Sequence, residues 1–184
     1  MTVLFTAEQI ARRVAELGEA IRRDFRGQPL TIVAILHGSI AFVSDLCEHL
    51  GDNLVVELLQ ASSYGDGTTS GGDVTISRYG QLAIAGRHVL LVDDIVDTGR
   101  TLDAVRKMVE GMSPLSVRAC VLLDKPSRRV VDVAIDYRGF EVPDVFVVGY
   151  GLDLAGRYRD LPYIARIGEG RAPARPGLWN LCEP

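Results

Sequence analysis

The sequence predicts an α/β protein in which a mainly parallel β-sheet is flanked by helices. Its short, continuous apolar runs, such as LTIVAIL over 30–36, are typical of strands that are covered on both faces. These runs alternate with segments of helical periodicity through the first two thirds of the chain, which favours parallel strands joined by helical crossovers. A length of 184 residues is sufficient for one domain with a substantial core.

The predicted elements follow one another with short connections. Residues 6–25 predict a helix, because Thr6 and Gln9 have capping-box spacing and apolar residues then recur every three or four positions. Two further helices are expected at 40–50 and 101–112. Besides 30–36, strands are expected at 54–64, 88–94, 116–124, 131–137, 144–151 and 163–168.

Composition narrows the class of protein and its surroundings. The formal net charge of -4 speaks against nucleic acid as the main partner, since phosphate backbones require clustered Lys and Arg. Cys47, Cys120 and Cys182 form neither a metal-binding pattern nor a disulfide framework, which fits a reducing compartment. The chain shows no signal-peptide core and no apolar run of membrane-spanning length. We therefore expect a cytoplasmic protein with no membrane partner.

Two segments contain little that could be buried. Residues 65–73, GDGTTSGGD, consist of Gly, Ser, Thr and Asp. They predict a flexible loop with outer bounds of about 63–77, which is either a lid or the tip of a hairpin. The tail over 169–184 is rich in Pro, Gly and Arg and is expected to be loosely ordered. A single domain is therefore expected over 1–168.

The stretch LLVDDIVDTGRTL, residues 90–102, brings three carboxylates to the end of a buried strand. Ligands of parallel α/β sheets bind beyond the carboxyl ends of the strands, where Asp93 and Asp94 are expected. The turn after them contains Thr and Gly and enters a helix, which suits backbone amides that bind a phosphate. Carboxylates can accept hydrogen bonds from vicinal sugar hydroxyls, so the combination suggests a ribose phosphate. The alternative is that the aspartates only cap the helix.

This stretch resembles the phosphoribosyl pyrophosphate (PRPP) signature of the type I phosphoribosyltransferases. The chain is similar, more narrowly, to the bacterial hypoxanthine-guanine phosphoribosyltransferases over about residues 5–168. The further segments LHGSIAF, ASSYGDGTTSGGDV, LLDKPSRR, GFEVPDVFVVGYGLD and RYRDLPYI occur in the order and spacing of that family. The resemblance implies the type I phosphoribosyltransferase fold, with a small hood subdomain and a flexible loop beside the central sheet.

The resemblance also implies a reaction, in which a purine ring nitrogen displaces pyrophosphate from C1′ of PRPP. Asp93 and Asp94 would hold the ribose hydroxyls, although Glu-Asp is frequent in the family at this pair. Asp97 would act as general base or acid near purine N7. The 5′-phosphate would be cradled by Asp97 together with Thr98, Gly99, Arg100 and Thr101, where Arg100 replaces a frequent Lys.

The turn at Leu36, His37 and Gly38 would carry a non-proline cis peptide whose amide meets pyrophosphate. His37 stands where Lys or Arg is frequent, so either its side chain makes pyrophosphate binding weaker and pH-sensitive, or only the backbone matters. Ser63 and Tyr64 would begin a lid that excludes water from the reacting centre.

The resemblance places the purine among three residues. Lys125 would bind the exocyclic O6 and select 6-oxopurines over adenine, although an exposed lysine at a strand end is the simpler interpretation. Phe146 would stack on the base, although a core aromatic in an apolar strand is the alternative. The backbone of Val147 would read the edge of the base.

Metal and pyrophosphate are assigned by the same resemblance. Asp153 would bind Mg²⁺ directly or through water, and Asp93 and Asp94 are further candidate ligands. Arg159 would contact pyrophosphate as a forked donor, or would be an ordinary surface arginine. A homodimer or homotetramer is expected by analogy with the family.

The expected activity is Mg-dependent purine salvage, giving IMP or GMP and pyrophosphate from hypoxanthine or guanine and PRPP. Two alternatives remain: an enzyme that prefers xanthine, and a non-catalytic regulator of the same fold that binds nucleotides and RNA. A regulator of that kind needs a basic face, which the acidic composition disfavours. Lys125 and Phe146 suit hypoxanthine and guanine alike.

Overall fold

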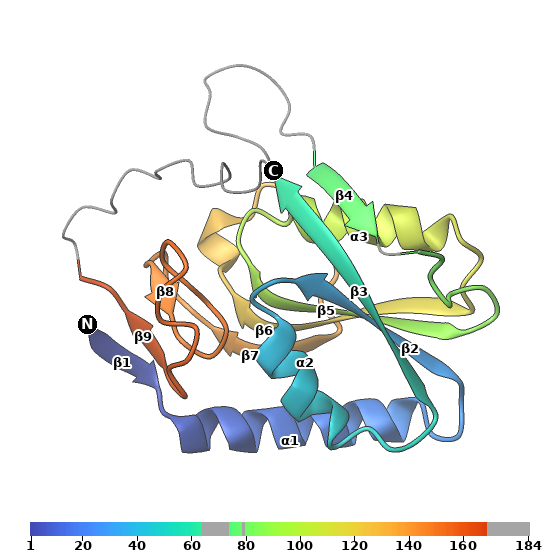
Figure 1. Ribbon diagram of the computed structural model, residues 1–184, viewed down its shortest axis with the longest axis horizontal. Helices are drawn as coiled ribbons and strands as arrows, with labels where there is room; N and C mark the ends of the chain where they lie inside the picture. Colours follow the sequence, from blue (N-terminus) through green and yellow to red (C-terminus); the bar gives the residue numbers. More distant parts are fainter. Residues whose placement is uncertain (64–73, 79, 169–184) are drawn as a thin grey trace, which may run out of the picture.

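A six-stranded sheet forms the centre of the protein (Figure 1). The computed structural model describes residues 1–63, 74–78 and 80–168. The sheet has the order β4-β3-β2-β5-β6-β7, and all its neighbours pair in parallel except β3 and β4. Its strands are β2 (Leu30–Leu36), β3 (Leu54–Ser63), β4 (Val74–Arg78), β5 (His88–Val96), β6 (Ser116–Asp124) and β7 (Tyr137–Glu141). The predicted fold class is confirmed.

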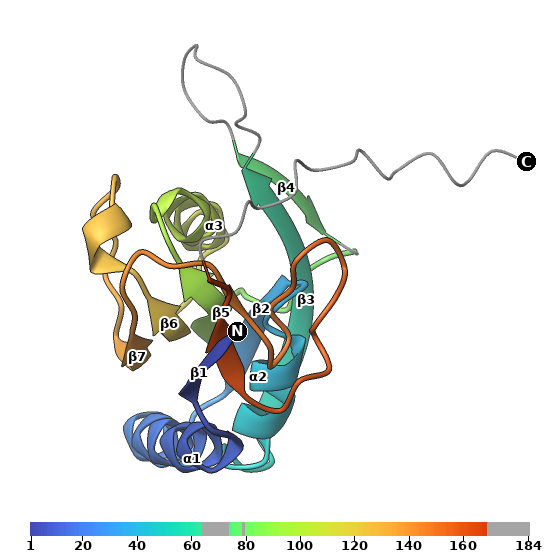
Figure 2. The same cartoon turned by 90° about the vertical axis from the view of Figure 1, so that its left-hand side faces the viewer.

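Helices cover both faces of this sheet, as Figure 2 shows from the side. The helices α1 (Ala7–Asp24) and α2 (Ile40–Cys47) lie on one face, and α3 (Arg100–Glu110) lies on the other. Strand β2 is buried on both sides, because Ile32 packs with the α1 and α2 side chains while Val33 packs with those of α3. Burial on both faces therefore explains the continuous apolar run of this strand, as predicted from the sequence.

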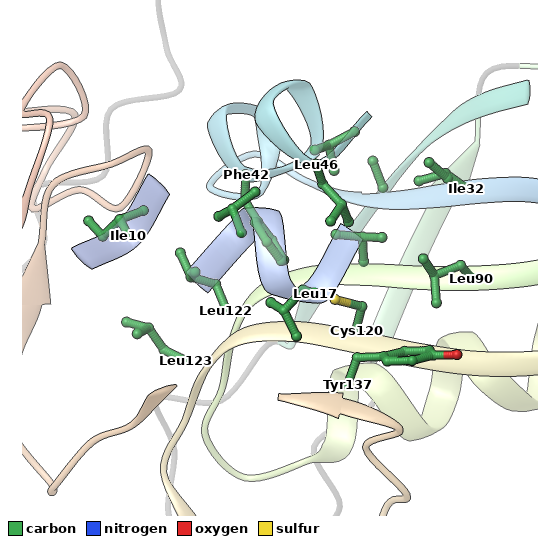
Figure 3. Packing of buried hydrophobic residues seen from close by; sticks show 14 of the residues in the cluster. Ile10, Leu17, Ile32, Phe42, Leu46, Leu90, Cys120, Leu122, Leu123 and Tyr137 are labelled. Atoms are coloured by element: carbon green, nitrogen blue, oxygen red, sulfur yellow. The ribbon is translucent and has the colours of Figure 1, made fainter. Parts of the chain in front are cut away.

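The larger apolar cluster lies between the sheet and the first two helices (Figure 3). Leu17 of α1 and the fully buried Phe42 and Leu46 of α2 meet Leu90 and Leu122 of the sheet there. Cys120 and Tyr137 complete the cluster toward β7. Burying side chains of this size stabilises the fold by about 2 kcal/mol each, so this cluster fixes the layer that supports the carboxyl ends of the strands.

The two ends of α1 are each held by polar contacts. At its start, the Thr6 side chain accepts from the backbone of Gln9, whose side chain accepts from Thr6 in return, so the predicted capping box is confirmed. At its end, the hydroxyl of Tyr137 donates to Asp24 over 2.7 Å, and Arg118 donates to the same carboxylate over 2.8 Å. These contacts lower the pKa of Asp24, the hydrogen bond from Tyr137 most of all.

A second, antiparallel sheet of three strands has the order β1-β9-β8 and corresponds to the expected hood subdomain. Its strands are β1 (Thr2–Phe5), β8 (Val147–Val148) and β9 (Ile164–Arg166). Figure 1 shows it at the left of the molecule, beside the end toward which β3 points. The ring of Phe5 stacks on Phe140 with centroids 4.1 Å apart, which ties this small sheet to β7.

Several predicted bounds are wrong. The strand expected at 131–137 begins at Tyr137, because the residues before it bury Val133 but make only one backbone hydrogen bond to β6, from Asp136 to Ala119. The strand expected at 144–151 shrinks to β8, because tight turns begin at Gly149. Strand β1 was not predicted. Within the described residues, no helix is long and apolar enough to cross a membrane.

The loop expected at about 63–77 is wrong at both ends. Ser63 closes β3, where it pairs with Val74, and residues 74–78 form β4 against β3. Residues 64–73, including Tyr64, lie outside the described part of the chain, as do Cys182 and the tail at 169–184. The predictions made for these residues are untested.

Candidate active site at the carboxyl edge of the sheet

Asp93 and Asp94 are held inside β5 rather than at its last residue, since the strand runs on to Val96. Asp93 pairs in register with Val121 of β6 and is only 6% exposed. The only hydrogen bonds that their side chains make within the described chain are local, from the amide of Asp94 to Asp93 and from the amide of Ile95 to Asp94. Asp93 is thus buried and Asp94 half-buried, and among the described residues neither carboxylate has a countercharge within 4 Å.

Burial of this pair has a clear electrostatic consequence. Loss of solvation raises the pKa of Asp93 well above its usual range, and the neighbouring charge of Asp94 raises it further. Loss of solvation also raises the pKa of Asp94. Such groups favour a ligand that brings hydrogen-bond donors or positive charge.

The turn after β2 packs directly against Asp94. The Leu36–His37 peptide is cis, as the resemblance implied, and the His37 side chain is exposed. A Cβ added to Gly38 would lie 1.6 Å from Oδ2 of Asp94, so only glycine allows this approach. The carbonyl of Gly38 lies equally close to Gly151, where an added Cβ would be 2.2 Å from it. The described structure therefore brings together three segments that are far apart in the sequence.

The loop after β5 has the form expected of an anion cradle. Gly99 has φ +85° and stands at the N-cap of α3, and no side chain caps that helix. Asp97 therefore does not cap α3, which contradicts the alternative that the aspartates serve only as helix caps. Thr98 accepts a 3.4 Å hydrogen bond from the amide of Arg100, and Arg100 and Thr101 form the first turn of α3. The exposed start of a helix favours negative charge.

A turn at residues 125–131, which includes the 3₁₀ helix η1 (Pro126–Arg128), supports this loop. The amide of Lys125 donates to Val96, and the amides of Val130 and Val131 both donate to the carbonyl of Thr98. An added Cβ on Gly99 would lie 2.5 Å from the carbonyl of Val131, so the two segments are in close contact. The segment expected to select the purine thus contacts the segment expected to hold the phosphate.

The two side chains expected to bind the purine do not have the exposure that a structural role would give them. Lys125 is only 8% exposed and has neither an ion pair nor a side-chain hydrogen bond within the described residues, so it is not an exposed strand-end lysine. Phe146 is 47% exposed, so it is not a core aromatic. The carbonyl of Phe146 accepts a hydrogen bond from the amide of Ile167, next to β9. The hydrogen-bonding groups of successive residues in an antiparallel strand point to opposite sides, so the amide and carbonyl of Val147 point away from β9, to the free edge of β8.

Arg159 and Asp153 are bound to each other over 2.8 Å, on the irregular segment that follows β8. The other guanidinium nitrogen of Arg159 donates to the carbonyl of Gly151 over 2.5 Å, and Asp153 also accepts from the amide of Gly156. Because Gly151 contacts Gly38, this pair is connected to the cis turn, which an ordinary surface arginine would not be.

Three arginines around Asp97 and β6 were not singled out from the sequence. Arg128 donates through Nε to Oδ1 of Asp97 over 2.9 Å. Arg129 and Arg138 both pair with Asp124, which is 1% exposed. The run LLDKPSRR carried the signal, since consecutive arginines after a buried strand that ends in Asp suggest an ion-pair network.

The carboxylates suit a divalent cation only in part. Within the described residues, no three ligating side chains gather into one metal site. Asp93, Asp94 and Asp153 nevertheless supply the hard oxygen ligands that Mg²⁺ prefers, and the raised pKa values of the first two leave them suited to a positively charged ligand. These residues fit a cation whose remaining ligands are substrate oxygens and water.

Comparisons with known proteins agree with this geometry. Residues 2–154 match the family model described as the phosphoribosyl transferase domain. The hypoxanthine phosphoribosyltransferase of Escherichia coli K12 is 43% identical over 167 residues, which cover 90% of this chain and 94% of that protein. The hypoxanthine-guanine phosphoribosyltransferase of Streptococcus mutans is 40% identical and covers 91% and 93%.

Solved structures give the same result. A hypoxanthine phosphoribosyltransferase from Staphylococcus aureus superposes with a TM-score of 0.85 at 41% identity, covering 90% of each chain. A hypoxanthine-guanine phosphoribosyltransferase from Bacillus anthracis, with a HEPES molecule in its active site, gives a TM-score of 0.86 at 40% identity. In that comparison the match covers 91% of this chain and 98% of the other.

Proposed function

Because this chain belongs to the phosphoribosyl transferase domain family, we propose that it transfers the 5-phosphoribosyl group of PRPP to hypoxanthine or guanine. The products are IMP or GMP and pyrophosphate, as in purine salvage. The observation that carries the proposal is the Asp93–Asp94 pair, which makes no ion pair within 4 Å among the described residues and is followed by a helix-entry loop that contacts the turn of Lys125. A ribose phosphate and a purine would bind on the two sides of that contact.

The PRPP side of the site is made by β5 and the loop after it. Asp93 and Asp94 accept hydrogen bonds from the ribose 2′ and 3′ hydroxyls. These bonds replace the hydrogen bonds to water that the carboxylates lose on folding. The 5′-phosphate lies in the loop from Asp97 to Thr101, where backbone amides and the start of α3 face it. Supporting contacts from the turn at residues 125–131 keep this loop in place before PRPP arrives.

The purine side selects 6-oxopurines. The Lys125 ammonium donates to O6, a bond that adenine cannot accept in the same way. The exposed ring of Phe146 stacks on the base, and the free backbone edge of Val147 pairs with the edge of the base. Buried polar groups that remain unpaired with the wrong base give strong discrimination, so Lys125 is the main selector.

In the reaction, the bond between C1′ and the pyrophosphate oxygen breaks, and its electron pair leaves with pyrophosphate. The lone pair of purine N9 forms the new bond to C1′. The proton that the neutral base carried on its imidazole ring passes to the carboxylate of Asp97 and then to water. Asp97 is suited to this role because its side chain is 40% exposed beside the phosphate loop, where a base could reach it.

Pyrophosphate and the metal lie on the third side of the site. The backbone of the His37–Gly38 turn and the guanidinium of Arg159 bind pyrophosphate. Asp153, with Asp93 and Asp94 as further ligands, holds Mg²⁺ directly or through water. When bound, the cation neutralises charge that builds up on the leaving group.

Three wider features complete the proposal. The segment that follows Ser63, beginning at Tyr64, closes over the reacting centre and excludes water. The protein assembles as a homodimer or homotetramer, by analogy with its relatives. It works in the cytoplasm and, given its net charge of -4, does not depend on nucleic acid.

The test is pyrophosphate release from PRPP and Mg²⁺ with hypoxanthine, guanine, xanthine or adenine supplied separately. Turnover is expected with hypoxanthine or guanine and should be lost in Lys125→Ala. The matched control is Lys107→Ala, which removes an exposed lysine on α3 and should leave turnover unchanged. No turnover with any base would overturn the enzyme reading, and turnover with adenine alone would overturn the role of Lys125.

A further inference from the structure

We propose that Arg128 is a positioning residue for Asp97, holding one carboxylate oxygen so that the other faces the purine. This proposal deepens the proposed function and rests on it. Arg128 lies on η1, only three residues after the proposed base selector Lys125. Its Nε donates to Oδ1 of Asp97 over 2.9 Å, and its NH1 lies 3.6 Å from Asp144.

The contact with Asp97 leaves half of the carboxylate free. Within the described residues, Arg128 is the only cation within 4 Å of the Asp97 carboxylate, and it engages Oδ1 alone. Arg129 reaches the same residue only through the Asp97 backbone carbonyl, over 3.5 Å. Oδ2 is thus available to a ligand while Oδ1 is fixed, which is how a base is kept in one orientation.

Arg128 also joins the parts that must act together on the purine. Asp144 lies two residues before Phe146, the proposed stacking ring, so one guanidinium connects the acid/base loop to the stacking segment. The guanidinium is planar and offers several donors in a rigid arrangement, so it can serve both carboxylates at once.

Two neighbouring arginines are already engaged elsewhere. Arg129 and Arg138 both pair with Asp124. Within the described residues, loss of Arg128 therefore removes the one direct cationic contact of the Asp97 carboxylate. The carboxylate would then be free to turn away from the purine.

The experiment compares kcat for IMP formation and the KM for PRPP in the wild type, Arg128→Gln and Arg128→Lys. In Arg128→Gln, we expect kcat to fall by about fivefold while the KM for PRPP is unchanged, because Asp97 remains but is no longer held in one orientation. Arg128→Lys keeps the charge but not the planar donor group, so it should restore only part of kcat.

Two controls make the result specific. Arg23→Gln removes the same charge from an exposed site at the end of α1 and should leave kcat and KM unchanged. Asp144→Asn removes only the second partner of Arg128 and should lower kcat less than Arg128→Gln does. A wild-type kcat in Arg128→Gln would overturn the inference alone, whereas a wild type that turns over no purine would overturn the proposed function and this inference with it.

Discussion

Gly38 shows how a single residue can decide whether the site exists. Its Cα lies so close to the Asp94 carboxylate that no side chain fits between them, and its carbonyl is in equally close contact with Gly151. The sequence drew attention to this turn only through a family resemblance, because a Gly after a strand predicts a turn and says nothing about a carboxylate at position 94.

Gly38→Ala should impair the site and leave the fold largely intact. The new methyl group would displace the Asp94 side chain, which can move, rather than a fixed backbone. A displacement of about 1 Å can reduce turnover on the order of 100-fold, so kcat/KM for PRPP should fall by that amount while Tm changes little. The control is Gly168→Ala, where an added Cβ meets nothing within 4 Å. Equal kcat/KM values in the two variants would contradict this view of Gly38.

At the scale of elements, the long regular segments could be predicted and the short or irregular ones could not. The bounds of β2 and β6 agree with the sequence, because buried parallel strands produce continuous apolar runs. Residues 131–137 have the alternation of a strand, yet only Tyr137 belongs to one, and the residues before it bury Val133 with a single backbone hydrogen bond to β6, from Asp136 to Ala119. β1 and β8 have only a few residues each, so whether they form depends on pairing with strands that are distant in the sequence.

The site divides in the same way. Asp93, Asp94 and Asp97 could be selected from one contiguous stretch because their charge is unusual after a buried strand. Arg128 could not, because its role depends on a contact across 31 positions that no local pattern encodes. Phe146 shows that a local pattern can also mislead. The apolar residues around it suggest a core position, yet its side chain is 47% exposed.

The end of α1 gives a prediction about pH. Contacts with Tyr137 and Arg118 hold the pKa of Asp24 below its ordinary value of 3.8. The stability that these contacts contribute is present above that value and is lost as pH falls through the lowered pKa. Asp24→Asn should therefore be less stable than the wild type at pH 7, and the difference should shrink in acid as the pH falls through the lowered pKa.

Urea unfolding at pH 7 and in acid measures this difference in the free energy of unfolding. Asp52→Asn, which changes an exposed carboxylate after α2, is the control and should match the wild type throughout. A stability difference for Asp24→Asn that persists unchanged in acid would show that the Asp24 contacts do not depend on its charge.

For the whole molecule, the site is placed where two sheets approach one another, and it is maintained at a cost in stability. The large sheet supplies Asp93, Asp94 and the turn of Lys125, while Val147 comes from the small sheet and Phe146 from the residue before it. The Asp93–Asp94 pair opposes folding at neutral pH, because carboxyl groups with raised pKa values bind protons more tightly in the folded state than in the unfolded chain. Residues required for a ligand often carry such a cost.

Asp93→Asn should therefore stabilise the free protein and weaken its response to ligand. Relief of the like-charge contact should raise Tm at neutral pH by about 3 °C. Addition of PRPP and Mg²⁺ should raise the Tm of the wild type, since a ligand that binds only the folded state stabilises it, and should raise that of the variant much less. Thermal melts with and without PRPP provide the measurement. A variant with lowered Tm and a wild-type response to PRPP would contradict this prediction.

The most direct measurement is kcat for IMP formation from hypoxanthine and PRPP by Asp97→Asn, with PRPP affinity measured alongside. The substitution keeps the size of the side chain and the backbone of the phosphate loop but removes the group that accepts the proton. We expect kcat to fall about 100-fold or more while the Kd of PRPP changes little. Unchanged turnover in Asp97→Asn would contradict the claim that this loop carries the chemistry of phosphoribosyl transfer.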